Sequence, residues 1–137
     1  MADIAITAAL VKATANPRAN SGLSGDTVVA GKTLAQNPAT KKFVLADSNH
    51  ADAWRRQVKA IALSGASDGQ PLFFHKSGPL DLGANVLTPG EAYYQSDTPG
   101  GICTLADVGV GENVVLIGLA KTAAILIVEI ADPGVTK

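Results

Sequence analysis

Residues 114–130 form the most apolar stretch of the chain, and they constrain its fold more than any other segment. The sequence V-V-L-I-G-L-A is followed by K-T-A and then by A-I-L-I-V-E-I. Val, Ile and Leu favour a pleated, packed surface, so the stretch predicts two β-strands folded back on each other. Alternation along the second strand separates Leu126, Val128 and Ile130 from Ile125, Ile127 and Glu129. A hairpin that is apolar on both faces needs a core on one side and a cover on the other, supplied by the chain itself or by another subunit.

From residue 26 onward the rest of the chain alternates short apolar runs with turn residues such as N-P-A-T (37–40), T-P-G (88–90) and S-D-T-P-G-G (96–101). Strands are expected at residues 27–30, 33–36, 42–46, 58–63, 71–76, 92–95 and 102–105, and a shorter strand or arm is expected from Gly78-Pro79 through Leu82. Short strands separated by turns every 8–12 residues are typical of an all-β protein. We therefore expect a compact β-sandwich or barrel of short antiparallel strands. At most one short helix is expected, near residues 48–56, where Ser48 or Asn49 precedes Ala51, Ala53 and Trp54.

The N-terminal residues 1–15 place Ile4, Ile6 and Leu10 at positions of one parity, which favours a strand or an extended arm. A short helix over residues 6–15 is the alternative, because Ala and Leu form helices well. Asn16-Pro17 ends either element. Residues 18–26 (R-A-N-S-G-L-S-G-D) predict a loop. The sequence thus divides into an N-terminal arm and hinge (1–20) and a β-domain (21–137).

Charge and cysteine content exclude several classes of function. The chain has 11 basic and 12 acidic residues, a balance that gives no general attraction to nucleic acid or to an anionic membrane. Its single cysteine, Cys103, excludes an intrachain disulfide and favours an inert buried thiol in a reducing compartment. The first residues lack the basic start of a signal peptide, and residues 114–130 contain Lys121 and Glu129. We therefore expect neither a signal peptide nor a transmembrane helix.

The sequence motifs that could support phosphate binding or catalysis are incomplete. Gly31-Lys32-Thr33 resembles the end of a phosphate-binding loop, but the glycine required five positions earlier is Asp26. Ser48, His50 and Asp52 lie within one short segment with Asp47, whereas a catalytic triad is assembled from separated segments, so polar loop caps are the better interpretation. His75 is expected to pack on a strand face. We expect no catalytic residue, no cofactor and no metal.

Three segments nevertheless resemble the capsid cement, or head decoration, proteins of tailed bacteriophages. They are A-I-A-L-S-G-A-S-D-G-Q-P-L (60–72), L-T-P-G-E-A-Y-Y-Q-S-D-T-P-G-G-I (87–102) and V-V-L-I-G-L-A (114–120), followed by a last aliphatic strand. A similar module occurs in phage fibre proteins. The resemblance covers about half of the chain. The aliphatic N-terminal segment and residues 47–57 are less typical of the family.

The resemblance implies a non-enzymatic protein of the virion, made in the host cytoplasm. It would bind the outer capsid surface and bridge neighbouring copies of the major capsid protein. It also implies association with itself, with a trimer favoured over a dimer, and no binding to nucleic acid or membrane. The candidate interface residues are Ile4, Ile6, Leu10, Trp54, Arg55 and Tyr94.

Two alternatives remain. One is a phage fibre or tail module that binds a host-surface glycan through Trp54, Tyr93 or Tyr94. The other is a small hydrolase built on residues 47–52.

Overall fold

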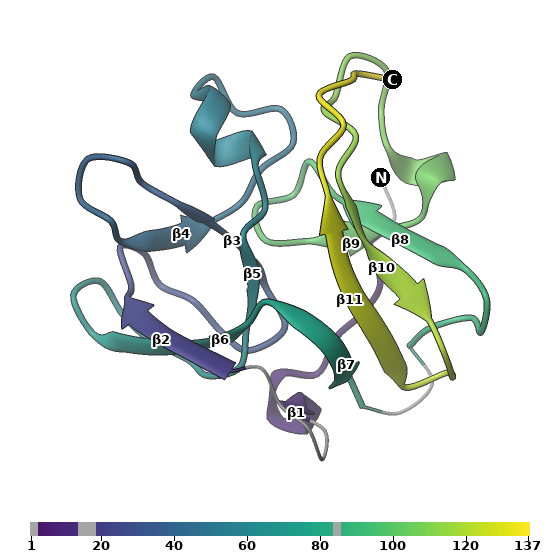
Figure 1. The fold of residues 1–137 in the computed structure, drawn as a ribbon, viewed down its shortest axis with the longest axis horizontal. Coiled ribbons are helices and arrows are strands. Elements are labelled where there is room, and N and C mark those ends of the chain that lie inside the picture. The colour runs from purple at the N-terminus through teal and green to yellow at the C-terminus, as the bar shows by residue number, and fades with distance from the viewer. Residues whose placement is uncertain (1–2, 14–18, 84–85) are drawn as a thin grey trace.

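A computed structural model describes residues 3–13, 19–83 and 86–137, and it has two antiparallel sheets (Figure 1). The strands of the six-stranded sheet are, in spatial order, β1 (Lys12–Ala13), β7 (Ser77–Asp81), β11 (Ile125–Ala131), β10 (Leu116–Ala120), β8 (Ala92–Gln95) and β9 (Ile102–Cys103). Those of the five-stranded sheet are β2 (Ala19–Leu23), β6 (Pro71–His75), β5 (Ala60–Ala62), β3 (Thr33–Gln36) and β4 (Phe43–Leu45). The predicted all-β fold of short antiparallel strands is confirmed.

Helical structure in the described residues is limited to short 3-10 turns at Ala8–Leu10, Ala53–Arg56 and Leu105–Asp107. The turn at Ala53–Arg56 lies where the sequence predicted a short helix. Its N-cap is Asp52, which makes no side-chain capping hydrogen bond, so the expected cap by Ser48 or Asn49 is wrong. The reason is that the side chain of Ser48 points into the protein, where its hydroxyl donates to Glu112.

The predicted hairpin is formed by β10 and β11, with Ala120 paired to Leu126 and Gly118 to Val128. Leu126 and Val128 lie on one face of β11 and Ile127 on the other, as the alternation predicted; the structure buries Leu126 and Val128 and leaves Ile127 half-buried. The register shifts between Leu116 and Gly118. A side chain at Gly118 would collide with the backbone of β11, because an added Cβ would lie only 3.2 Å from the Cα of Val128 and closer still to the Ile127 carbonyl. Glycine therefore allows the two strands to approach at the bulge.

The five-stranded sheet curls so that its two edge strands meet. Ser24, which follows β2, bridges to Phe43 of β4, and the Gly25 N–H donates to the Phe43 carbonyl at 2.8 Å. The curl encloses a small core, in which the rings of Phe43 and Phe74 lie 4.4 Å apart. The buried members of this core are Val28, Leu34, Phe43, Ala60, Ala62, Ala66, Leu72 and Phe74.

The larger core lies between the two sheets. Strand β6 of one sheet is followed after a single residue by β7 of the other, so the chain crosses between the sheets at Lys76 (Figure 1). Near this crossing, a ring nitrogen of buried His75 lies 3.0 Å from the Gly78 carbonyl oxygen. The core includes side chains from both sheets, among them Ala35, Ile61, Leu80, Tyr93, Ile117 and Leu126.

Two local predictions are wrong. The loop expected at residues 18–26 contains strand β2, which pairs with β6 along its length. Instead of the strand expected at residues 27–30, the structure has an isolated bridge between Val28 and Ala66. The sequence A-N-S-G-L has little strand propensity of its own, so its conformation depends on pairing with β6.

The N-terminal segment shows a 3-10 turn and the short strand β1 in place of either long element that the sequence allowed. Asn16-Pro17 lies outside the described residues, whereas the loop proposed as a hinge at residues 18–26 is described from residue 19 onward and contains β2. The division into an arm and a β-domain stays a prediction.

Candidate functional site

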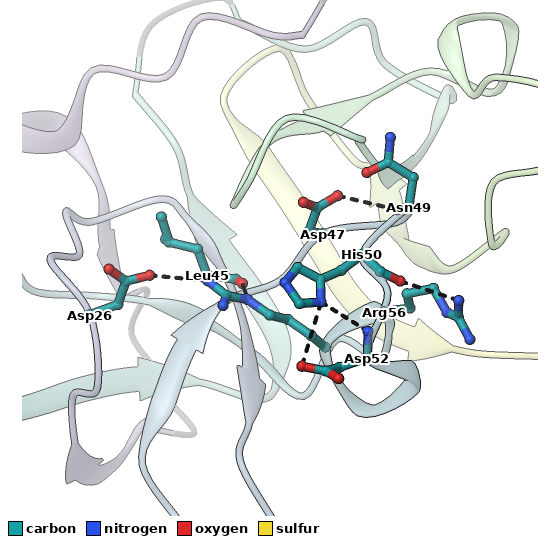
Figure 2. Close-up of polar contacts among 8 residues, drawn as sticks. Asp26, Leu45, Asp47, Asn49, His50, Asp52 and Arg56 are labelled. Atoms are coloured by element: carbon teal, nitrogen blue, oxygen red, sulfur yellow. Dashed lines mark hydrogen bonds and ion pairs between the residues drawn. The ribbon is translucent and has the colours of Figure 1, made fainter.

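The polar loop at residues 47–57 is the first candidate, because it holds the residues considered for a hydrolase. The Asn49 N–H donates to Asp47 Oδ1 at 3.1 Å, and the Asp52 N–H donates to His50 Nδ1 at 3.0 Å (Figure 2). The Asp52 carboxylate lies 3.8 Å from the same ring nitrogen. These contacts are local, within two residues, and they fix the shape of the loop as the polar-cap interpretation predicted.

Ser48 takes no part in a triad geometry. It is buried, and its hydroxyl donates to Glu112 Oε1 at 2.8 Å. Beside it, the Gln95 amide donates to the Arg56 carbonyl at 2.8 Å and accepts from the Asp47 N–H at 3.1 Å, in the orientation that satisfies both groups. Since Glu112 and Gln95 belong to the part of the chain that forms the six-stranded sheet, these bonds tie the loop to that sheet.

Trp54 and Arg55, which were candidates for an interface, are both half-buried within the chain. Trp54 packs against the larger core. The Arg55 Nε donates to the Leu45 carbonyl at 3.0 Å, and its Nη2 lies 3.2 Å from Asp26 Oδ2. Arg55 thus ties the loop to the five-stranded sheet.

Ile4, Ile6 and Leu10 lie along the N-terminal segment, which rests on the rest of the protein. The Ile4 N–H donates to the Ile102 carbonyl at 3.0 Å, and Ile4 and Ile6 pack against the larger core. Leu10 remains 48% exposed. Asp3, Ile4 and Ile6 contribute to the lining of a cavity of about 60 Å³.

The N-terminal segment can approach the rest of the protein closely because glycines face it from separate loops. Ile6 Cγ2 lies 2.6 Å from where a Cβ of Gly31 would be, and Leu10 Cβ lies at the same distance from that of Gly83. Both glycines have positive φ angles, +91° and +92°. The Asp3 carboxylate accepts from the Ser96 hydroxyl at 2.6 Å. The segment is therefore seated by specific contacts along its length.

Other residues singled out in the sequence are buried in structural positions. Thr33, from the incomplete phosphate-loop motif, is buried at the start of β3. Cys103 is buried in β9, and its burial, together with the nearby carboxylates of Asp3 and Asp107, raises the pKa of its thiol to about 12. At neutral pH this thiol is protonated and unreactive.

The outer face of the six-stranded sheet carries a group of apolar side chains at the surface. Residues that are paired across neighbouring strands lie on the same face of the sheet. Leu119 is paired with Ile127 and with Ala92, and Leu116 is paired with Tyr94. Ile125 lies on this face because it is two residues from Ile127 on the same strand. These side chains point away from the larger core and are half-buried, apart from Leu119, which is 51% exposed. We call the set the outer hairpin face: Ala92, Tyr94, Leu116, Leu119, Ile125 and Ile127.

A second exposed apolar group lies on the other sheet. Leu23 of β2 is paired with Pro71 of β6. Phe73 lies two residues after Pro71 on β6, so the three side chains are on the same face of the sheet. Leu23 is 50% exposed and Phe73 is 53% exposed. We call this set the β2–β6 patch. The alternation in P-L-F-F-H predicts an outward Phe73, but Leu23 was missed because its strand was not predicted.

The structure does not bring all the sequence-predicted interface residues together. Tyr94 belongs to the outer hairpin face, Ile4, Ile6 and Leu10 follow the N-terminal segment, and Trp54 and Arg55 lie in the loop between β4 and β5.

No family model matches the chain, and no curated protein matches it. In the described part of the chain, no helix has the length and apolarity that crossing a membrane requires. Across residues 3–13, 19–83 and 86–137, no three His, Cys, Asp or Glu side chains are grouped so as to hold a metal ion.

Proposed function

We propose that this chain is a non-enzymatic structural protein that binds the outer surface of a phage capsid and stabilises it by bridging neighbouring capsid subunits. The proposal rests on the resemblance of residues 60–72, 87–102 and 114–120 to capsid cement proteins. These segments include strands β5, β8 and β10, which contribute to both sheets.

The observation that carries the proposal is that each sheet presents its own apolar surface. A bridging protein needs two adhesive surfaces, and the outer hairpin face and the β2–β6 patch lie on different sheets. Burial of such surfaces against a neighbour contributes about 25 cal/mol for each Å² of apolar area removed from water. Contiguous exposed apolar patches on small proteins commonly mark interaction sites.

Binding to shells assembled from the major capsid protein alone tests the proposal. Purified chain is mixed with such shells and sedimented, and saturable co-sedimentation is expected, with shells that resist higher temperature or urea. Leu23→Arg is expected to weaken binding, because it places a charge in the β2–β6 patch. The matched control is Leu105→Arg, at a leucine that is 44% exposed and lies outside both patches.

A wild-type chain that stays in the supernatant at saturating shell concentration refutes the capsid role. Equal weakening by Leu23→Arg and Leu105→Arg refutes the assignment of the β2–β6 patch. The glycan-binding alternative is favoured by Tyr94, whose ring lies on the outer hairpin face. Hits on a glycan array that are lost in Tyr94→Ala, without binding to shells, support that alternative instead.

A further inference from the structure

We propose that the half of the chain that forms the five-stranded sheet docks on an acidic protein surface, with the other half turned away from that surface. The inference deepens the proposed function, because it names the chemistry of the surface that the β2–β6 patch contacts, and it rests on that function for the identity of the partner. We call residues 19–76 the five-stranded half and residues 77–137 the six-stranded half; they meet where the chain crosses between the sheets.

The charges of this nearly neutral chain are divided unequally between the two halves. The five-stranded half contains seven basic and four acidic residues, a net charge of +3. The six-stranded half contains two basic and seven acidic residues, a net charge of −5, and residues 1–18 contribute +1. The five-stranded sheet and the β10–β11 hairpin occupy opposite sides of the molecule (Figure 1). The protein is therefore an electric dipole with its positive end at the five-stranded sheet.

The acidic side chains of the five-stranded half already have partners within that half. Asp26 Oδ2 lies 3.2 Å from Arg55 Nη2, and Asp68 Oδ1 lies 3.4 Å from Lys42 Nζ. The other two acidic residues belong to the loop at residues 47–57, where their carboxylates contact neighbouring residues of the loop. The negative charge of this half is therefore neutralised locally, whereas part of its positive charge is not.

Three lysines of the five-stranded half are exposed and form no ion pair with any residue that the structure describes: Lys41, Lys59 and Lys76. Lys41 lies in the turn between β3 and β4, and Lys59 directly precedes β5. Lys76 directly follows β6, the strand that carries Pro71 and Phe73 of the β2–β6 patch. These three ammonium groups remain available to carboxylates of a partner.

The β2–β6 patch favours an acidic protein over a nucleic acid as the partner. Leu23 and Phe73 are 50% and 53% exposed on the positive half, so the surface combines apolar contact with positive charge. The phosphate backbone of a nucleic acid offers negative charge without apolar area, and its binding depends on neutralising many phosphates. A protein surface with Asp and Glu around an apolar centre matches both features of this half.

The dipole also sets the orientation of the bound chain. An acidic surface attracts the five-stranded half and repels the six-stranded half, so encounters in the productive orientation are favoured. The attraction acts over about 10 Å at 0.1 M ionic strength and over shorter distances at higher salt. We therefore expect binding that is fastest at low salt, although the chain as a whole carries a net charge of −1.

Retention on beads coated with poly-L-glutamate tests the positive half without capsid protein. The wild type should be retained at 20 mM NaCl, and Lys59→Glu/Lys76→Glu should weaken retention at least about tenfold. The matched control is Lys121→Glu/Lys137→Glu, which changes the net charge equally at two exposed lysines of the six-stranded half and should stay within about twofold of the wild type. The neutral variant Lys59→Gln/Lys76→Gln should fall between the wild type and its charge-reversed counterpart. Thermal unfolding of each variant confirms that it is folded.

Association with shells of the major capsid protein tests the partner. The rate constant of association should fall several-fold between 50 and 300 mM NaCl, and Lys59→Glu/Lys76→Glu should lower it at least about fivefold at 50 mM, whereas the control variant should not. Leu23→Glu should weaken binding to shells several-fold more than Leu23→Arg, because both variants lose the apolar contact but only the glutamate is repelled by an acidic surface.

Equal effects of the two double variants, or a wild type that is not retained on poly-L-glutamate, overturn the inference. Tighter binding to duplex DNA than to poly-L-glutamate at the same salt also overturns it, since a nucleic acid would then be the better partner. Binding to shells at a rate that is independent of salt overturns the inference and leaves the capsid role intact. Lysine-dependent retention on poly-L-glutamate without binding to shells supports the acidic docking surface and refutes the capsid role.

Discussion

Replacing Leu126 by Ala tests the central feature of the fold, which is that the β10–β11 hairpin has one face in the core and one face at the surface. Leu126 is fully buried between the two sheets, whereas Leu119 on the neighbouring strand is 51% exposed on the outer hairpin face. The same substitution at these two positions removes the same atoms from the same hairpin. Only the environment differs, so Leu119→Ala is the matched control.

The expected decrease in the free energy of unfolding depends on how deeply each leucine side chain is buried. Leu126→Ala removes fully buried methyl groups and leaves a cavity between the sheets, which should cost about 3 kcal/mol. Leu119→Ala loses only the contact made by a half-exposed side chain and leaves no cavity, so it should cost about 1 kcal/mol or less. For a domain of this size the corresponding decreases in Tm are roughly 10 °C and 3 °C.

Urea unfolding followed by the fluorescence of Trp54, the single tryptophan, measures both free energies of unfolding. The protein is diluted until the midpoint no longer changes, so that self-association does not contribute. Equal costs for the two variants, or a larger cost for Leu119→Ala, would refute the assignment of inner and outer faces.

Four further outcomes are expected. Cys103 should not react with a thiol reagent at pH 8 until the protein unfolds, because burial raises the pKa of its thiol from 9.0 to about 12. The contribution of the protonated thiol to the free energy of unfolding is complete below pH 9 and should be lost as the pH rises toward 12. Unfolding curves at several pH values measure this loss. Ser48→Ala should cost about 1–3 kcal/mol, because it leaves the buried Glu112 carboxylate without its donor, and a stability equal to the wild type would contradict this role. Gly31→Ala should lower Tm and speed proteolysis near the N-terminus, because its Cβ meets Ile6 at a positive φ, whereas Gly69→Ala, at a similar φ with open space around it, reports the backbone strain alone. Removal of residues 1–15 should leave the β-domain folded and weaken attachment to shells; loss of cooperative unfolding would show instead that these residues belong to the core.

Local sequence patterns predicted the strands that bury one face. In β11 the alternation separates Leu126 and Val128 from Ile125 and Ile127, and the structure places the two pairs on opposite faces of the sheet. The hairpin of β3 and β4 was predicted from Asn37-Pro38-Ala39-Thr40, because Asn and Pro favour turns between strands. For Asp47 and His50 the interpretation as polar loop caps also needed only local information, since both side chains bond to backbone N–H groups within two residues.

Contacts between distant segments decided the rest. Strand β2 exists because A-N-S-G-L pairs with β6, about fifty residues later, and no local pattern encodes that pairing. The burial of Ser48 depends on Glu112, which is 64 residues away. The sequence by itself determined that the chain is all-β and that its last hairpin is apolar on both faces, because alternation and turn chemistry act between neighbouring residues. The tertiary structure alone decided which apolar side chains stay at the surface, because exposure depends on which strands from elsewhere in the chain cover them.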